Sequence, residues 1–358
     1  METRPALAVP GPPTPTPEAS PAKARLLKRL RRHPFNEPWW LRGGHLQTIW
    51  SPFFRTRTAP PLRKERWTTP DEDFLNVYRL EGEERSPIVV LLHGLEGCVR
   101  SNYVLGLAAA LARRAWSVAA VEHRSCGGEM NRARRLYHSG WTEDLAFVVN
   151  RLIQECPDRR IYLVGYSLGG NQIAKWLGEL GERAPAQVAG AAVVSAPFDL
   201  TISGPHLDRL MRGAYVRWFL RTLIPKALAK ERQYPGSLNV EGVRRARTFE
   251  EFDTHATAPL HGFRDAWDYW ASCGCGQFLP GVRRPTVLIS SADDPFNPGR
   301  TLPRQLAEGH PFLLPLFSDR GGHCGFVHGR SPRHSRHWAE EQVLGFLDGL
   351  EAIAAGRL

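Results

Sequence analysis

Long apolar runs are missing from this chain of 358 residues. No stretch reaches the roughly 18–20 consecutive apolar residues that cross a bilayer. The first 21 residues are rich in Pro, Thr and Ala and contain no apolar core typical of a secretory leader. The six cysteines are scattered without the spacing of a disulfide framework, which favours reduced thiols and a cytoplasmic protein.

Motifs for bound metals and nucleotides are also scarce. The chain has no H-E-x-x-H motif and no phosphate loop, and Gly127-Gly128 lacks the third glycine of a dinucleotide fingerprint. Cys273-Gly-Cys275 and His323-Cys324 supply soft ligand types, but no paired knuckle accompanies them. We therefore expect neither a cofactor nor a metal, with a zinc site as the weaker alternative.

Positive charge is abundant but unevenly placed. Of the net charge of +11, most lies in residues 1–66, which hold 13 Lys or Arg and only four Glu. The segment 23–32 could form a basic amphipathic helix that touches anionic lipid through Leu26, Leu27 and Leu30, or a solvated lead-in helix. No basic stripe with interleaved aromatics recurs in the body, so nucleic-acid binding is not expected.

Composition divides the chain into a tail and one large domain. Residues 1–22 contain seven Pro and little that could form a core, and we expect them to be disordered. The predicted division is a basic tail over 1–32 and a domain over 33–358. The aromatic-rich stretch 33–61 should pack onto that domain, followed by short strands at 62–69 and 73–80.

Buried strands and amphipathic helices alternate from residue 88 onward. This alternation predicts an α/β fold, with a mostly parallel sheet covered by helices on both faces. The expected strands are 88–93, 116–121, 161–165, 189–195, 285–290 and 312–317, and the expected helices 102–114, 141–155, 168–180 and 338–354.

About ninety residues separate the fourth and fifth of these strands, far more than one crossover needs. We expect an inserted helical cap over about 201–260 and a crossover helix over 262–273. Within the cap, Leu207, Leu210, Met211, Ala214 and Trp218 recur at helical spacing. This pattern favours the buried face of one helix, with an acyl-chain pocket as the alternative.

The strongest chemical signal is Gly165-Tyr-Ser167-Leu-Gly169-Gly170, between a predicted strand and a predicted helix. Glycines suit a strand-to-helix turn too tight for side chains, which lifts the serine hydroxyl out at the sheet edge. The alternative, that Ser167 is only a helix N-cap, leaves the flanking glycines unexplained. We predict that Ser167 is a nucleophile.

A serine nucleophile needs a base and a group that orients the base. The order Ser, acid, His is that of α/β-hydrolases. Asp293-Asp294 follows the fifth strand and His323 the sixth, at the edge where ligands bind in open α/β sheets. Asp294 is preferred over Asp293, because the run Asp-Pro-Phe-Asn-Pro resembles the Asp-x-x-x-Pro common after the acid in this fold. A structural surface histidine is the alternative for His323.

The reaction also needs donors for the developing oxyanion. We expect the backbone N–H groups of Leu168 and of Leu95, in the loop 93–97, to supply them. His93 should order that loop rather than take part in chemistry. The Arg-rich segment 131–140 either faces the site or is a structural loop.

Several motifs together resemble the YheT-like group of α/β-hydrolases, also called AB hydrolase family 4. They run in order from about residue 33 to the C-terminus: Gly43-Gly-His45-Leu-Gln-Thr48, His93-Gly-Leu-Glu-Gly97, His123-Arg-Ser-Cys-Gly127, Tyr137-His-Ser-Gly140, Gly165-Tyr-Ser-Leu-Gly-Gly-Asn171, Ser195-Ala-Pro-Phe198, His261-Gly-Phe263, Asp293-Asp-Pro-Phe296 and Gly321-Gly-His323. The resemblance implies hydrolysis of carboxylic esters by Ser167, Asp294 and His323. Some relatives act on phospholipids or acylglycerols and a few transfer acyl groups to alcohols; membrane-anchored relatives carry an N-terminal span that this chain lacks.

The expected function is that of a carboxylesterase or lipase-like enzyme in lipid metabolism. It would act on a small-molecule acyl ester through an acyl-enzyme, with medium-chain and lipid esters as the candidate substrates. The alternatives are an acyltransferase with the same acyl-enzyme and a non-catalytic ligand receptor of the same fold. We expect a cytoplasmic protein, with peripheral contact between its basic N-terminus and an anionic membrane surface as the weaker alternative.

Overall fold

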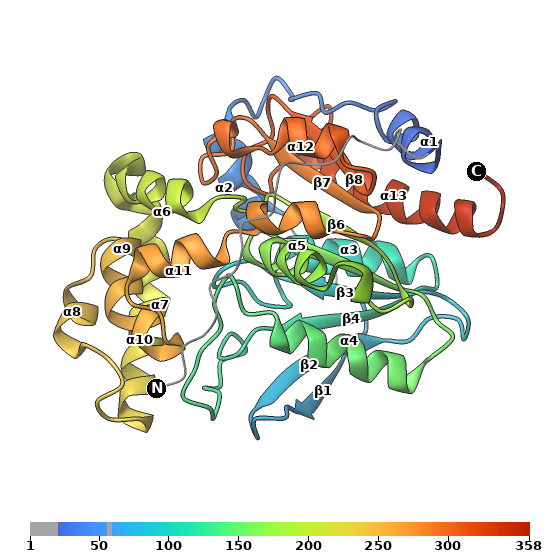
Figure 1. Ribbon diagram of the computed structural model, residues 1–358. Helices are drawn as coiled ribbons and strands as arrows, with labels where there is room; N and C mark the ends of the chain where they lie inside the picture. Colours follow the sequence, from blue (N-terminus) through green and yellow to red (C-terminus); the bar gives the residue numbers. More distant parts are fainter. Residues whose placement is uncertain (1–20, 56–58) are drawn as a thin grey trace.

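An eight-stranded sheet forms the centre of the computed structural model, which describes residues 21–55 and 59–358 (Figure 1). The strand order is β1-β2-β4-β3-β5-β6-β7-β8. The strands are β1 (Arg63–Thr68), β2 (Phe74–Leu80), β3 (Ile88–Leu92), β4 (Ser117–Glu122), β5 (Ile161–Tyr166), β6 (Val188–Val194), β7 (Thr286–Ser291) and β8 (Leu313–Ser318). A separate ribbon pairs β9 (Val327–His328) with β10 (Arg336–His337).

Only β2 runs against its neighbours in the large sheet; the six strands from β4 to β8 pair in parallel. β3, β4, β5 and β7 are buried along their whole length. Continuous apolar strands of this kind need cover on both faces. The predicted mostly parallel sheet with helices on both faces is confirmed.

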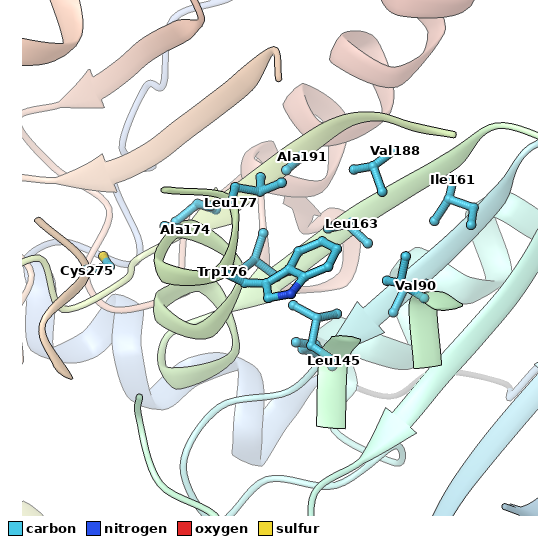
Figure 2. Packing of buried hydrophobic residues seen from close by; sticks show 14 of the residues in the cluster. Val90, Leu145, Ile161, Leu163, Ala174, Trp176, Leu177, Val188, Ala191 and Cys275 are labelled. Carbon is cyan, nitrogen blue, oxygen red and sulfur yellow. The ribbon is translucent and has the colours of Figure 1, made fainter. Parts of the chain in front are cut away.

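Two apolar clusters lie on opposite faces of the sheet. One packs α4 and α5 against side chains such as Val90 and Leu163, with Trp176 of α5 in the layer between (Figure 2). The other packs α3 and α13 against Val89 and Leu91. The helices of the body are α1 (Pro21–Leu30), α2 (Gly44–Phe54), α3 (Asn102–Ala112), α4 (Glu143–Glu155), α5 (Leu168–Leu180), α12 (Arg304–Gly309) and α13 (Trp338–Ala354).

Between β6 and β7 the chain forms a helical cap with its own apolar core, at the left of Figure 1. Its helices are α6 (Leu200–Arg209), α7 (Ala214–Gln233), α8 (Val240–Arg245), α9 (Phe249–Phe252), α10 (Ala258–His261) and α11 (Ala266–Cys273). The crossover helix expected over 262–273 begins later than predicted and belongs to the cap. Gly262 is left-handed and ends α10, α11 begins only at Ala266, and Tyr269 and Trp270 of α11 belong to the cap core.

The prediction of a single helix that carries Leu207 to Trp218 is wrong. The chain breaks at η2 (Leu210–Gly213), where Met211, Arg212 and Gly213 all adopt left-handed φ angles. Met211 and Trp218 are 59% and 57% exposed, so they do not belong to a buried helix face. The prediction failed because the apolar residues keep helical spacing in the sequence although the chain turns at Met211.

α1 packs against α13 and β8. Leu26 and Leu30 are 2% and 3% exposed, so the expectation that they insert into lipid is wrong. Lys23 donates from Nζ to the carbonyl oxygens of Ala307, Glu308 and His310. Residues 21–30 thus join the folded body instead of the expected tail, while the disorder expected for 1–20 lies outside the described residues. None of the helices in the described ranges is long and apolar enough to span a bilayer.

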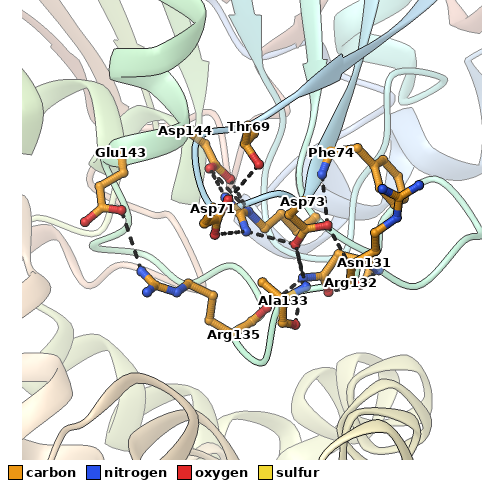
Figure 3. Close-up of polar contacts among 12 residues, drawn as sticks. Thr69, Asp71, Asp73, Phe74, Asn131, Arg132, Ala133, Arg135, Glu143 and Asp144 are labelled. Atoms are coloured by element: carbon orange, nitrogen blue, oxygen red, sulfur yellow. Dashed lines mark hydrogen bonds and ion pairs between the residues drawn. The ribbon is translucent and has the colours of Figure 1, made fainter.

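A buried polar cluster ties the loop after β4 to the edge of the sheet (Figure 3). Arg124 donates to Asp71, Asp73 and Asp144, and Asp73 also accepts from Asn131 Nδ2 at 2.6 Å. Lys230 of α7 donates to the carbonyl oxygens of residues 131 and 133 at 2.8 and 2.7 Å. The Asn131 end of the Arg-rich segment is therefore structural, and it holds the cap onto the body.

Candidate active site

Ser167 occupies the sharp turn between β5 and α5. Its backbone is left-handed, with φ 52° and ψ −118°, which is strained for a non-glycine residue. A Cβ on Gly165 would overlap the backbone of Gly169, and a Cβ on Gly169 would come within 2.7 Å of the His93 oxygen. The glycines are needed for close backbone approach, as the sequence predicted.

His323 and Asp294 meet at the end of β7 and β8. His323 Nδ1 lies 2.9 Å from Asp294 Oδ2, and both side chains are nearly inaccessible to solvent. Burial lowers the pKa of His323, but the charge of Asp294 and its hydrogen bond outweigh burial and raise that pKa above its ordinary value. The arrangement fixes Nδ1 on the carboxylate and leaves Nε2 for a substrate-side proton.

The two neighbouring carboxylates have different partners. Asp294 Oδ1 accepts from the backbone N–H groups of Phe296 and Asn297, at 2.7 and 3.1 Å, while Oδ2 faces His323. Asp293 Oδ1 accepts from Gly322 N at 2.9 Å. Burial raises the pKa of Asp293. The geometry favours Asp294 as the partner of the imidazole, while Asp293 holds the loop at Gly322.

The His323 loop is held by α2, a contact that sequence reasoning missed. His323 N donates to Thr48 Oγ1 at 2.9 Å. Gln47 accepts from Val327 N at 2.7 Å and donates to its oxygen at 3.0 Å. Both residues belong to the motif 43–48 that carries the resemblance, which was the only available signal.

Two further residues around the imidazole were also missed. Asn297 Nδ2 lies 3.3 Å from Asp294 Oδ2 and donates to Ser195 O at 3.0 Å. Ser195 Oγ accepts from Cys324 N at 3.0 Å. These bonds connect the ends of β6, β7 and β8, so the base and its acid are fixed to the sheet.

The loop after β3 lies opposite Ser167. Gly94, Leu95, Ser167 and Leu168 line one cavity, and Leu168 is the first residue of α5, whose N–H has no acceptor within the helix. His93 is fully buried; it accepts from His123 N at Nε2, so its Nδ1 donates to Gly94 O at 2.8 Å. Burial lowers the pKa of His93 well below its ordinary value, consistent with a neutral residue that orders the loop.

Glu96 connects this loop to the cap. Its backbone is left-handed, with φ 53°, and its N–H donates to the hydroxyl of Tyr137 at 2.8 Å. The Tyr137 hydroxyl and Lys226 Nζ of α7 both donate to Glu96 Oε1, each at 2.7 Å. Tyr137 and its neighbours 136, 138 and 139 line the cavity, so this half of the Arg-rich segment does face the site.

The cavity has a volume of about 1280 Å³ and lies between the sheet edge and the cap. Its floor includes Ser167 and His323, and its walls are mainly apolar and aromatic. The apolar lining includes Leu46, Ile49, Phe53, Leu136, Leu200, Leu207, Met211, Trp218, Phe219, Leu223, Phe249, Phe252, Leu260 and Phe296. Leu207, Met211 and Trp218 thus follow the alternative expected for them, as walls of a pocket.

The soft ligand types do not meet. Among residues 21–55 and 59–358, no three His, Cys, Asp or Glu side chains lie close enough to hold a metal ion. Cys273 Sγ lies 3.9 Å from His138 Nδ1, and Cys275 Sγ faces the Pro197 oxygen. Both thiols are buried packing groups, Cys273 in the cap core and Cys275 in the core of the body.

A family profile described as alpha/beta hydrolase fold matches residues 87–329. "Putative esterase YheT" of Escherichia coli (strain K12) is 35% identical over 313 residues, which cover 85% of this chain and 89% of that protein. The chain belongs to the YheT-like family of α/β-hydrolases. The predicted family is therefore confirmed.

More distant relatives carry enzyme names. The monoacylglycerol lipase of Saccharomyces cerevisiae is 29% identical over 80% of this chain and 63% of its own length. The medium-chain fatty acid ethyl ester synthase/esterase 2 of the same yeast is 29% identical over 75% of this chain and 63% of its own. The Pyrococcus furiosus esterase Pf2001 shares the fold, with a TM-score of 0.51 at 15% identity over 82% of this chain and 98% of that one. The family's esterases and lipases support a hydrolase.

Proposed function

We propose that the protein hydrolyses carboxylic esters with an apolar acyl chain, through an acyl-enzyme on Ser167. The observation that carries the proposal is the cavity itself. A strained serine and the imidazole of a buried His–Asp pair line one apolar space. A structural serine or a surface histidine would not require that combination.

In this mechanism His323 removes the proton of Ser167 as the hydroxyl attacks the ester carbonyl. Asp294 holds the imidazole in the required tautomer and stabilises its positive charge. The N–H groups of Leu95 and Leu168 donate to the oxyanion, and each such donor contributes roughly 3 kcal/mol to the transition state. His323 then protonates the departing alcohol, and water repeats the sequence to release the acid.

The lining of the cavity supports an acyl chain of medium length or a lipid ester as substrate. The volume of about 1280 Å³ exceeds what a short acyl group fills, and the walls offer mainly carbon. The yeast relatives bear lipase and medium-chain ester names. Ester hydrolysis should therefore improve as the acyl chain lengthens from acetate.

The proposal is tested by labelling and by turnover. A fluorophosphonate probe should react once per chain, and Ser167→Ala should abolish both labelling and hydrolysis of p-nitrophenyl esters. Ser203→Ala is the matched control, because Ser203 lines the same cavity and its hydroxyl has no hydrogen-bond partner among the described residues. Labelling that persists in folded Ser167→Ala would assign the nucleophile elsewhere.

Acyl transfer to an alcohol is the second candidate, favoured by the name of the synthase/esterase relative. The same acyl-enzyme would serve, with an alcohol replacing water in the second step. Product analysis in the presence of ethanol distinguishes the two: free acid as the main product supports hydrolysis, and ethyl ester as the main product supports transfer.

A further inference from the structure

The cavity opens to solvent between α2 and α7. Leu46 and Phe53 of α2 line the cavity although they are 48% and 63% exposed, and Met211 and Trp218 of the cap do the same. The rings of Phe53 and Trp218 meet edge to face, with centroids 6.1 Å apart. Side chains that both line a cavity and face solvent mark its mouth.

This mouth has an apolar rim made of Leu46, Ile49, Phe53 and Phe54 on α2 and Met211 and Trp218 on the cap. These six account for most of the large apolar side chains exposed among the described residues. Single exposed apolar residues need no explanation, but a contiguous group around a cavity marks an interaction surface.

The backbone presents Met211 outward at an energetic cost. Met211 and Arg212 adopt left-handed φ angles of 47° and 53°, and Gly213 follows at 77°. Non-glycine residues reach this region at an energetic cost and persist there only when the surrounding structure imposes it. The turn interrupts what the sequence pattern would extend as a helix, and so points Met211 away from the cap core.

Positive charge surrounds the cap side of the rim. Segment 209–221 contains Arg209, Arg212, Arg217 and Arg221 and no Asp or Glu. All four arginines are exposed, and none forms an ion pair within the described parts of the chain. An apolar group bordered by unpaired arginines is the composition that binds an anionic lipid surface.

We propose that this rim docks on an anionic lipid–water interface and admits the acyl chain of a lipid ester directly from it. The apolar side chains enter the outer acyl layer while the arginines contact the headgroups, so the substrate need not cross water. The proposal rests on the proposed function for what enters the cavity, but not for the docking itself. Lipid contact is then expected at the cap and not at the basic helix α1. That helix lies beside α13, at the end of the molecule away from the cap (Figure 1).

The test is sedimentation of the full chain with vesicles of phosphatidylglycerol or of phosphatidylcholine alone. Wild-type protein should bind the phosphatidylglycerol vesicles more tightly, and rising salt should weaken that binding. Arg209→Glu/Arg212→Glu should weaken vesicle binding at least about tenfold, since each basic residue near an anionic surface contributes to the binding free energy. Hydrolysis of a soluble short-chain ester should stay unchanged, because neither arginine lines the cavity.

Arg25→Glu/Lys28→Glu on α1 is the matched control, with the same charge change on exposed positions far from the cap. It should reduce vesicle binding much less than the cap variant. An equal loss in both variants would overturn the rim, and so would wild-type protein that ignores phosphatidylglycerol vesicles at low ionic strength.

Phe54→Ser tests the apolar part, since Phe54 is 64% exposed and does not line the cavity. It should weaken vesicle binding; a change of a dimer to a monomer, with vesicle binding intact, would instead assign the rim to self-association and overturn the proposal. Sedimentation needs no turnover. Lost binding with intact hydrolysis counts against the rim alone, and binding by a chain that hydrolyses no ester counts against the proposed function alone.

Discussion

Ser167 shows how much of this site depends on single backbone positions. Its left-handed φ places the hydroxyl at the sheet edge only because Gly165 and Gly169 let two backbone segments touch. The sequence could predict this local geometry, since the strand, the turn and the helix are adjacent in the chain.

The supports of His323 could not be predicted in the same way. Thr48 and Gln47 lie about 280 residues before the loop they hold, as shown by the separations of 275 and 280 residues across their hydrogen bonds. Ser195 and Asn297 meet 102 residues apart. One sequence carries no record of such long-range partners, because polar residues in loops have no periodicity that would identify their contacts.

Substitution of Asp294 tests its role as the residue that orients His323. Asp294→Asn should lower kcat of ester hydrolysis by a factor on the order of 10⁴, because the imidazole loses both its tautomer control and its counter-charge. Asp293→Asn should cost far less, since its carboxylate holds Gly322 N and not His323. Steady-state kinetics on one p-nitrophenyl ester measure both variants.

Thermal unfolding of the two variants is the control, because each aspartate also holds a loop. A larger loss of kcat in Asp293→Asn, with both proteins folded, would transfer the acid role to Asp293.

Regular elements of the body were predictable nearly to the residue. The strand expected at 161–165 is Ile161–Tyr166, and the helix expected at 168–180 is Leu168–Leu180. Fully buried strands read as unbroken apolar runs, and the helices that cover them carry one apolar face. The cap did not follow this rule, since its helices are short and its turn at Met211 keeps helical spacing in sequence while breaking the helix in space.

α7 also acts on the loop that should hold the oxyanion. Lys226→Met removes one of two donors to Glu96 Oε1, and the loop 93–97 would then lose its ion pair with the cap and keep only the packing of Leu95. A charged hydrogen bond contributes about 1.5–3 kcal/mol. We expect kcat for a short-chain ester to fall roughly tenfold or more with a smaller change in KM, as for an interaction made mainly in the transition state.

Arg232→Met on the same helix is the control, because that side chain is exposed and should leave kcat unchanged. If Lys226→Met raised only KM, the lysine would contact substrate and would not position the oxyanion loop.

At the scale of the whole molecule, α1 belongs to the folded domain and not to the predicted N-terminal tail. Its composition is basic and its neighbours 1–20 are proline-rich, so the sequence favoured a tail that continues to residue 32. The three leucines of α1 gave the opposite signal, but a short amphipathic helix has the same pattern whether its apolar face meets lipid or protein. In the structure the apolar face of α1 meets protein. A Cβ on Gly349 of α13 would come within 2.6 Å of the Leu26 side chain, so the two helices are in close contact.

The stability of the whole domain should therefore depend on α1. Leu26→Ala leaves a cavity between α1 and α13 and should lower the free energy of unfolding by about 2–5 kcal/mol. Lys28→Ala, two residues further along the same helix and exposed, should change it by no more than about 0.5 kcal/mol. Urea unfolding followed by fluorescence measures the free energy of unfolding of both variants. Equal values would show that α1 is a solvated tail and does not stabilise the domain. Because α1 lies at the opposite end from the cap, Leu26→Ala should leave kcat for a soluble ester unchanged under conditions where the variant is fully folded.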